Sequence, residues 1–62
     1  MYRNLKGLRA KHNLTQSDMA RIIGISIVSY NQKEKCIKQF TLKEAKIIAN
    51  YFNETLDYVF AA

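Results

Sequence analysis

Apolar residues recur at helical spacing in the C-terminal third of the chain. Between residues 42 and 52 they are separated by three, three, one and three positions, which places them on one continuous face of a helix. The set consists of Leu42, Ala45, Ile48, Ala49 and Phe52. The spacing predicts a helix whose apolar face packs into the core.

Polar residues that favour helix ends separate the apolar segments. Thr15 is a natural N-cap for a helix over residues 16–23, Asp18 follows three residues later, and Gly24 ends the segment. The later helices have similar starts, namely Ser26 before a helix from 27 to about 35, Thr41 before 42–52 with Glu44 at the capping-box position, and Thr55 before a last turn through 60.

The N-terminal residues complete the set of helices. Leu5 and Leu8 keep helical spacing, and Asn13 tolerates the left-handed conformation that ends many helices. The chain has no proline and only two glycines, so little in it favours strands and their turns. We therefore expect an all-α protein with five helices and a single domain over residues 1–62.

Residues 16–35 form the most informative unit of the pattern. Two short helices are joined by a turn over residues 24–26, which is too tight for antiparallel packing, so the helices must cross steeply. Such a crossing needs a small side chain at Ala20, a glycine at Gly24 and apolar residues between the helices. Those apolar residues are Met19, Ile23, Ile25 and Tyr30. The unit has the features of a helix-turn-helix.

Charge points to the kind of partner. The chain of 62 residues has a formal charge of +5, and its first 40 residues hold eight basic against two acidic residues. A polyanion is the partner that this surface favours. The single cysteine allows no internal disulfide, and no apolar run approaches the roughly 20 residues of a membrane span. We expect a soluble, cytoplasmic protein.

The chain resembles the Cro/repressor-type (XRE) helix-turn-helix family of phage and bacterial regulators. The resemblance rests on 14–16, 19–20, 23–26, Tyr30 and Glu34, and continues through Leu42, 48–49, Phe52 and 56–60. It implies a compact, five-helix, lambda-repressor-like domain. The implied function is that of a sequence-specific regulator, most simply a repressor, which binds a double-stranded DNA operator and needs no cofactor.

Three residues depart from the family pattern, and two of them lie near the expected DNA-facing region. Lys33 replaces an apolar residue, and we expect its stem to cover Tyr30 while its ammonium reaches towards phosphate. Cys36 replaces a glycine, so we expect this helix to end differently from those of the family. Glu54 stands where a small apolar residue is usual. Asn13 and Asn53 also replace glycines, but asparagine accepts the left-handed conformation.

A helical wheel identifies the side chains that would read bases. Ile27, Val28, Asn31 and Gln32 share one side of the helix over 27–35, and the resemblance places base-reading residues at these outward positions. The amides of Asn31 and Gln32 suit the adenine edge, and the methyl groups of Ile27 and Val28 suit thymine. We expect a preference for A·T-containing half-sites, although Ile27 or Val28 individually could merely fill space.

Other residues are expected to position the protein on DNA or to support the fold. Gln16, Ser26, Lys35 and Lys38 are predicted phosphate contacts, the first of them through the resemblance. The resemblance also pairs Arg9 with Glu34, which would tie the groove helix to the scaffold. The alternative for this pair is an exposed ion pair that contributes little.

Assembly and competing functions complete the expectations. Palindromic operators need two half-sites, so we expect a homodimer at least on DNA. The resemblance implies that its contact lies near Thr55, Tyr58 and the tail 60–62. The alternative function is a protein-interaction module, antitoxin-like or adaptor-like, using an apolar patch of Ile22, Ile47 and Tyr51. One histidine and one cysteine cannot close a metal site, and no motif indicates an enzyme, a small-molecule ligand or membrane attachment.

Overall fold

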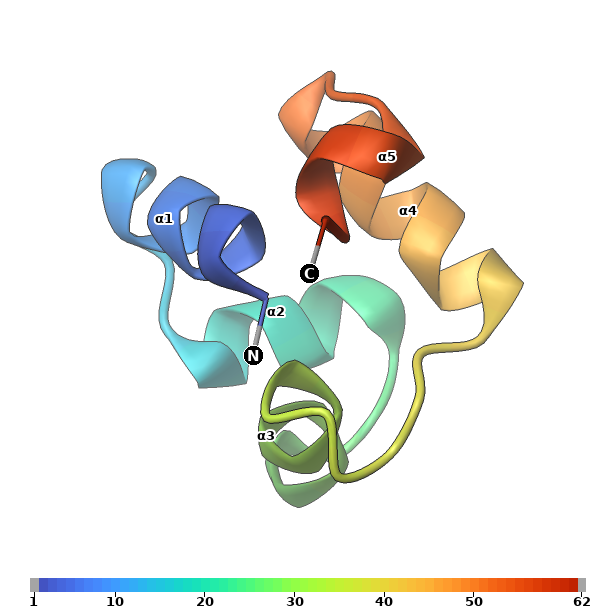
Figure 1. The fold of residues 1–62 in the computed structure, drawn as a ribbon. Coiled ribbons are helices and arrows are strands. Elements are labelled where there is room, and N and C mark those ends of the chain that lie inside the picture. Colours follow the sequence, from blue (N-terminus) through green and yellow to red (C-terminus); the bar gives the residue numbers. More distant parts are fainter. Residues whose placement is uncertain (1, 62) are drawn as a thin grey trace.

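Five helices and no strand make up the part of the chain that a computed structural model describes, residues 2–61 (Figure 1). They are α1 (Arg3–Lys11), α2 (Gln16–Ile23), α3 (Ile27–Glu34), α4 (Leu42–Phe52) and α5 (Leu56–Val59). The expected all-α, five-helix architecture is confirmed. Residue 62, part of the tail expected at the dimer contact, lies outside the described residues, as does residue 1.

Side-chain caps begin four of the helices, at the residues that the sequence predicted. The hydroxyl oxygens of Thr15, Ser26, Thr41 and Thr55 each accept the backbone N–H of the residue three positions later. Asp18 and Glu44 return the interaction by accepting the backbone N–H of their own N-cap, which completes two capping boxes. These short-range bonds satisfy N–H groups that would otherwise lack a partner.

The first four helices all end on a residue in the left-handed conformation. Asn13, Gly24 and Asn53 have φ values of 56°, 77° and 55°, as expected, and Cys36 has a φ of 65°. At every one of these ends the same two backbone bonds close a Schellman motif; at Cys36 they run from Ile37 N–H to the Gln32 carbonyl and from Cys36 N–H to Lys33. The expectation of a different end at Cys36 is therefore wrong. The two bonds hold the turn despite the cost of a left-handed β-carbon.

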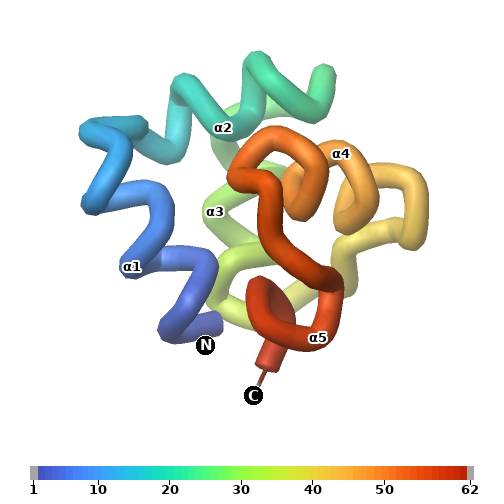
Figure 2. Tube along the Cα trace, turned by 90° about the horizontal axis from the view of Figure 1, so that it is seen from above, coloured from blue at the N-terminus to red at the C-terminus, as the bar shows by residue number. Residues whose placement is uncertain are grey.

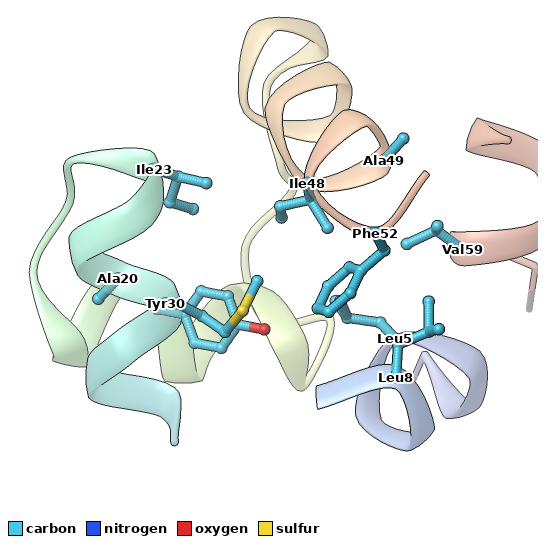
Figure 3. Packing of buried hydrophobic residues seen from close by; sticks show 10 residues of the cluster. Leu5, Leu8, Ala20, Ile23, Tyr30, Ile48, Ala49, Phe52 and Val59 are labelled. Carbon is cyan, nitrogen blue, oxygen red and sulfur yellow. The ribbon is translucent and has the colours of Figure 1, made fainter. Parts of the chain in front are cut away.

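The core lies where α1, α2, α3, α4 and α5 converge (Figure 3). It contains Leu5, Leu8, Met19, Ala20, Ile23, Tyr30, Ile48, Ala49, Phe52 and Val59. Four of the five residues predicted for the apolar face of α4 are buried, but Leu42 is 64% exposed. Leu42 is the first residue of α4 and borders an open groove of about 650 Å³.

The start of α1 and the end of α5 lie side by side, as the ribbon in Figure 1 and the tube in Figure 2 both show. Asn4 donates a 2.7 Å hydrogen bond to the Tyr58 carbonyl, and the ring of Tyr2 packs edge-on against Phe60 with centroids 5.3 Å apart. Phe40, in the loop after α3, packs against both rings. This aromatic cluster fastens the α3–α4 loop to the two ends of the fold. None of the helices in residues 2–61 is long and apolar enough to cross a membrane.

Candidate nucleic-acid interface

The packing of α2 against α3 determines which side of α3 is free. Gly24 adopts its left-handed conformation directly after α2, and Ala20 is buried at the crossing. Met19, Ile23 and Tyr30 fill the space beneath, so α3 crosses α2 and lies at the lower edge of the molecule in Figure 1. On the outer side of α3, Asn31 contacts the first residue of α2, and the side chains of Ile27 and Val28 are exposed.

The predicted base-reading residues lie on this outer side. Ile27 and Val28 are 50% and 64% exposed, and Asn31 and Gln32 are partly exposed one turn further on. Exposed apolar side chains that lie next to one another can form part of a surface that binds a partner. The structure therefore brings the four side chains together as one surface, which we call the α3 outer face.

A buried carboxylate anchors the inner side of α3. Glu34 is only 4% exposed and accepts four hydrogen bonds. The Arg9 guanidinium donates two, at 3.1 and 3.2 Å, the Tyr30 hydroxyl donates one at 2.6 Å, and the Gln16 side-chain amide donates one at 3.1 Å. Arg9 also donates to the Leu14 carbonyl. The geometry is a two-pronged, largely buried ion pair rather than an exposed one.

Electrostatics favour the ionised form of Glu34. Burial by itself raises the pKa of Glu34, but hydrogen bonds from Tyr30, Arg9 and Gln16, together with the charge of Arg9, outweigh burial and hold the pKa below its usual value of 4.5. The same contacts act oppositely on Tyr30, because burial and the neighbouring carboxylate both raise the pKa of its hydroxyl. Glu34 is thus a fixed negative charge between α1, α2 and α3.

Gln16 connects this buried charge to the α3 outer face. Its amide nitrogen donates to Glu34, and its amide oxygen accepts a 2.9 Å hydrogen bond from the Asn31 side chain. The resemblance had suggested a phosphate contact for Gln16, and sequence reasoning gave no sign that it touches Asn31. The two residues are 15 positions apart, so only the crossing of α2 and α3 brings them together.

Lys33 differs from its expected role. Its ammonium lies 2.6 Å from a Glu44 carboxylate oxygen, and both side chains are only 13% exposed. The expectation that it reaches towards phosphate is wrong, because the capping box at the start of α4 holds Glu44 in reach of α3. Burial raises the pKa of Glu44, but bonds from Lys33 and from the Thr41 backbone outweigh it and lower the pKa.

The other predicted phosphate contacts border the α3 outer face. Lys35 and Lys38 are exposed beside the C-terminal end of α3, and Ser26 is exposed at its start, where its hydroxyl oxygen caps Ser29. Between the two lysines lies Ile37, which is among the most exposed large apolar residues. Sequence reasoning did not select Ile37. The signal that could have identified Ile37 is its position between two lysines directly after α3.

The predicted dimer residues lie on α5. Thr55 caps the helix, and Tyr58 is exposed, while Val59 is fully buried and Leu56 packs against the core. The apolar patch required by the alternative function is less continuous, because Ile22 and Ile47 pack against the core and only Tyr51 is largely exposed. Residues 2–61 contain no cluster of three or more His, Cys, Asp or Glu side chains that could hold a metal ion.

Comparison with known proteins agrees with this geometry. A model of the helix-turn-helix family matches residues 5–59, a span that includes α2, the turn and α3. No curated protein and no solved structure matches the chain. Because the family match covers most of the chain, the resemblance noted in the sequence is confirmed. The chain belongs to the XRE-type helix-turn-helix family of DNA-binding transcription regulators.

Proposed function

We propose that the protein is a sequence-specific repressor that inserts α3 into the major groove of a palindromic operator and thereby blocks polymerase. The observation that carries the proposal is the α3 outer face: Ile27 and Val28 stand exposed beside Asn31 and Gln32 on a helix whose other side is anchored by Glu34. The major groove of B-DNA, about 12 Å wide, admits a helix in this orientation.

The side chains of the α3 outer face suit A·T base pairs. An amide such as that of Gln32 can accept from adenine N6 and donate to adenine N7, and the methyl groups of Ile27 and Val28 can pack against the thymine methyl. Gln32 is the leading base reader, because no side-chain hydrogen bond within residues 2–61 engages its amide. This chemistry supports half-sites that contain A·T pairs.

Positive charge beside α3 supports phosphate binding. Lys35 and Lys38 lie next to the C-terminal end of the helix, and Ser26 and Gln16 lie at the starts of α3 and α2, where backbone N–H groups add positive potential. The first 40 residues carry a net charge of +6, so the basic surface and α3 belong to the same part of the chain. Contacts to phosphate orient the helix and by themselves carry no sequence preference.

One groove helix reads only a few base pairs, so the proposal includes a homodimer on DNA. Two copies related by a two-fold axis would place their α3 helices about 34 Å apart, one turn of the duplex. Tyr58 is the interface residue that we propose, with Thr55 beside it, because Tyr58 is exposed on α5 whereas its neighbour Val59 is buried.

Selection of bound DNA from a random pool tests the function directly. We expect a palindromic motif with A·T pairs in each half-site. Gln32→Ala should then relax the preference at one base pair of each half-site, at a cost of about 1–3 kcal/mol on the selected motif and little on random DNA.

Lys38→Ala provides the matched control. It should weaken binding to all sequences alike and reduce the slope of log K against log salt by about one unit. Binding of the wild type without any motif, or equal weakening of motif and random DNA by Gln32→Ala, would contradict base reading by α3.

A further inference from the structure

The hydrogen bonds between Glu34, Gln16 and Asn31 form a relay from the buried interior to the α3 outer face. Gln16 Nε2 lies 3.1 Å from Glu34 Oε1, and Asn31 Nδ2 lies 2.9 Å from Gln16 Oε1. All three side chains are buried or partly buried, so water competes weakly for these bonds. The relay runs from α3 to the first residue of α2 and back to α3.

The direction of each bond in the relay follows from the charge at its inner end. An ionised carboxylate can only accept hydrogen bonds, so Gln16 must turn its NH₂ group towards Glu34. The oxygen of Gln16 then faces Asn31, and Asn31 must donate. One N–H and the carbonyl oxygen of Asn31 remain for an outside partner. If the Asn31 amide were rotated by about 180°, its oxygen would face the oxygen of Gln16, which is unfavourable.

Two other features hold the inner end of the relay in place. Arg9 and Tyr30 occupy the remaining acceptor positions of Glu34, which fixes the carboxylate plane and keeps it charged. Gln16 itself follows the N-cap Thr15, whose capping box fixes the first turn of α2. The orientation of Asn31 is therefore set by residues from α1, α2 and α3 together.

We propose that Gln16 is a positioning residue for base recognition. Because Glu34 can only accept, Gln16 turns its oxygen towards Asn31. Asn31 therefore presents its own oxygen and one N–H to a base edge in a single orientation. The inference rests on the proposed function. The edge that fits an adjacent donor and acceptor in the major groove is that of adenine, with N6 as donor and N7 as acceptor. Guanine offers two acceptors there and would meet the Asn31 oxygen with another oxygen.

The relay predicts a different result from a phosphate contact at Gln16. A residue that binds only phosphate contributes equally on every sequence, so its loss weakens all binding alike. A residue that positions Asn31 contributes only where Asn31 reads a base. The two roles therefore predict different results at the base pair that Asn31 reads. Loss of a positioning residue changes the base preference there, whereas loss of a phosphate contact does not.

The first experiment uses the free protein and needs no DNA. Gln16→Met keeps the length of the side chain but removes both hydrogen bonds, and Gln39→Met, at an exposed glutamine in the loop after α3, is the matched control. Side-chain amide signals of Asn31 in NMR spectra should shift, and their exchange with water should accelerate at least about threefold, in Gln16→Met only. Unchanged Asn31 signals in a folded Gln16→Met protein would overturn the relay.

The second experiment measures base preference. We expect Gln16→Met and Asn31→Ala each to relax the preference at the same base pair, by about three- to tenfold, and the double variant to lose no more than Asn31→Ala alone. Uniform, additive weakening on all sequences would overturn the inference while leaving the proposed function standing. A wild-type protein without any sequence preference would instead overturn the proposed function and the inference with it.

Discussion

Glu34 illustrates how one buried charge organises its neighbours. A carboxylate that is 4% exposed would be costly without partners, because burial removes its hydration. Four donated hydrogen bonds from Arg9, Tyr30 and Gln16 replace that hydration. No buried side-chain N or O atom in the described part of the chain lacks a hydrogen-bond partner. The charge that anchors α3 is therefore part of the stability of the fold.

The Tyr30 hydroxyl should stabilise the protein only while Glu34 is ionised. Tyr30→Phe removes a donor to a buried carboxylate, so we expect a loss of about 1.5–3 kcal/mol in the free energy of unfolding at pH 7. The bond lowers the pKa of Glu34, so its contribution is present above the unfolded pKa near 4.5 and is lost as the pH falls through the lower, folded value. Urea unfolding at a series of pH values measures this.

Tyr51→Phe is the control for that experiment, because Tyr51 is an exposed tyrosine on α4. It should change stability little at any pH. A loss in Tyr30→Phe that stays the same over the whole pH series, down to the pH at which Glu34 is protonated, would show that the hydroxyl does not act on the charged carboxylate.

Cys36 is strained where glycine would not be. Its φ of 65° places a β-carbon in the left-handed region, which costs roughly 1–2 kcal/mol, whereas glycine loses about 0.5–1 kcal/mol more entropy on folding. Cys36→Gly should therefore raise the free energy of unfolding by up to about 1.5 kcal/mol. Thermal and urea unfolding check the sign.

Gly24→Ala provides the opposite case. An added β-carbon at Gly24 meets no atom within 4 Å, so its cost of about 1 kcal/mol should come from the φ of 77° alone. A destabilised Cys36→Gly protein, or an unaffected Gly24→Ala protein, would contradict the strain account.

At the scale of the helices, local chemistry in the sequence was sufficient to predict where four of the five helices begin. Thr15 and Thr41 make their caps with residues three positions away, so the caps of α2 and α4 could be read directly. Leu42 was misplaced because helical spacing cannot tell whether a neighbour covers the first turn. Cys36 was misjudged because residue preference was given more weight than the backbone bonds that close the turn.

The candidate site was less predictable than the helices. The helical wheel identified the exposed side of α3, since that depends only on residues within the helix. The contact between Gln16 and Asn31 depends on how α2 crosses α3, and that between Lys33 and Glu44 on the path of the loop between α3 and α4. The pairing of Arg9 with Glu34, 25 positions apart, was accessible only through the family resemblance.

The bond between Lys33 and Glu44 should couple α3 to α4. We expect a double-mutant cycle with Lys33→Met and Glu44→Gln to give a coupling energy of about 1 kcal/mol, because both side chains are largely buried and glutamine preserves the capping box. Urea unfolding of the four proteins measures this energy.

The exposed pair of Asp18 and Arg21, 3.6 Å apart on α2, gives a comparison within the same chain. A cycle on this pair should give a coupling energy near zero, since water screens it. Equal coupling in the two cycles would mean that burial does not strengthen the Lys33 bond.

At the scale of the whole molecule, charge divides the protein into two parts. Residues 1–40, which include α3, carry a net charge of +6, whereas residues 41–62 carry −1. In the proposed dimer, two copies would meet through α5, in the part of the chain with a net charge of −1, so electrostatic repulsion between them would be small. This asymmetry is consistent with assembly on the operator.

Tyr58→Asp tests that assembly. The substitution should abolish cooperative filling of an operator with two half-sites, because a charge would enter the proposed contact, while single half-site affinity and the melting temperature stay nearly unchanged. Titrations on one-site and two-site DNA measure both quantities. Tyr51→Asp, at an exposed tyrosine on α4, should leave cooperativity intact. Equal loss of half-site binding or of stability in Tyr58→Asp would place Tyr58 in the core instead.

The repeated left-handed helix ends have a consequence for how quickly the chain folds. Each of the four ends is closed by bonds between residues at most five positions apart, and the capping boxes span only three, so the helix boundaries need no distant partner. Helices of 4–11 residues are marginal alone and become stable as they pack. Slow folding steps are therefore limited to the packing of a few segments whose ends are already defined. Helical proteins with mostly local contacts fold in microseconds to milliseconds.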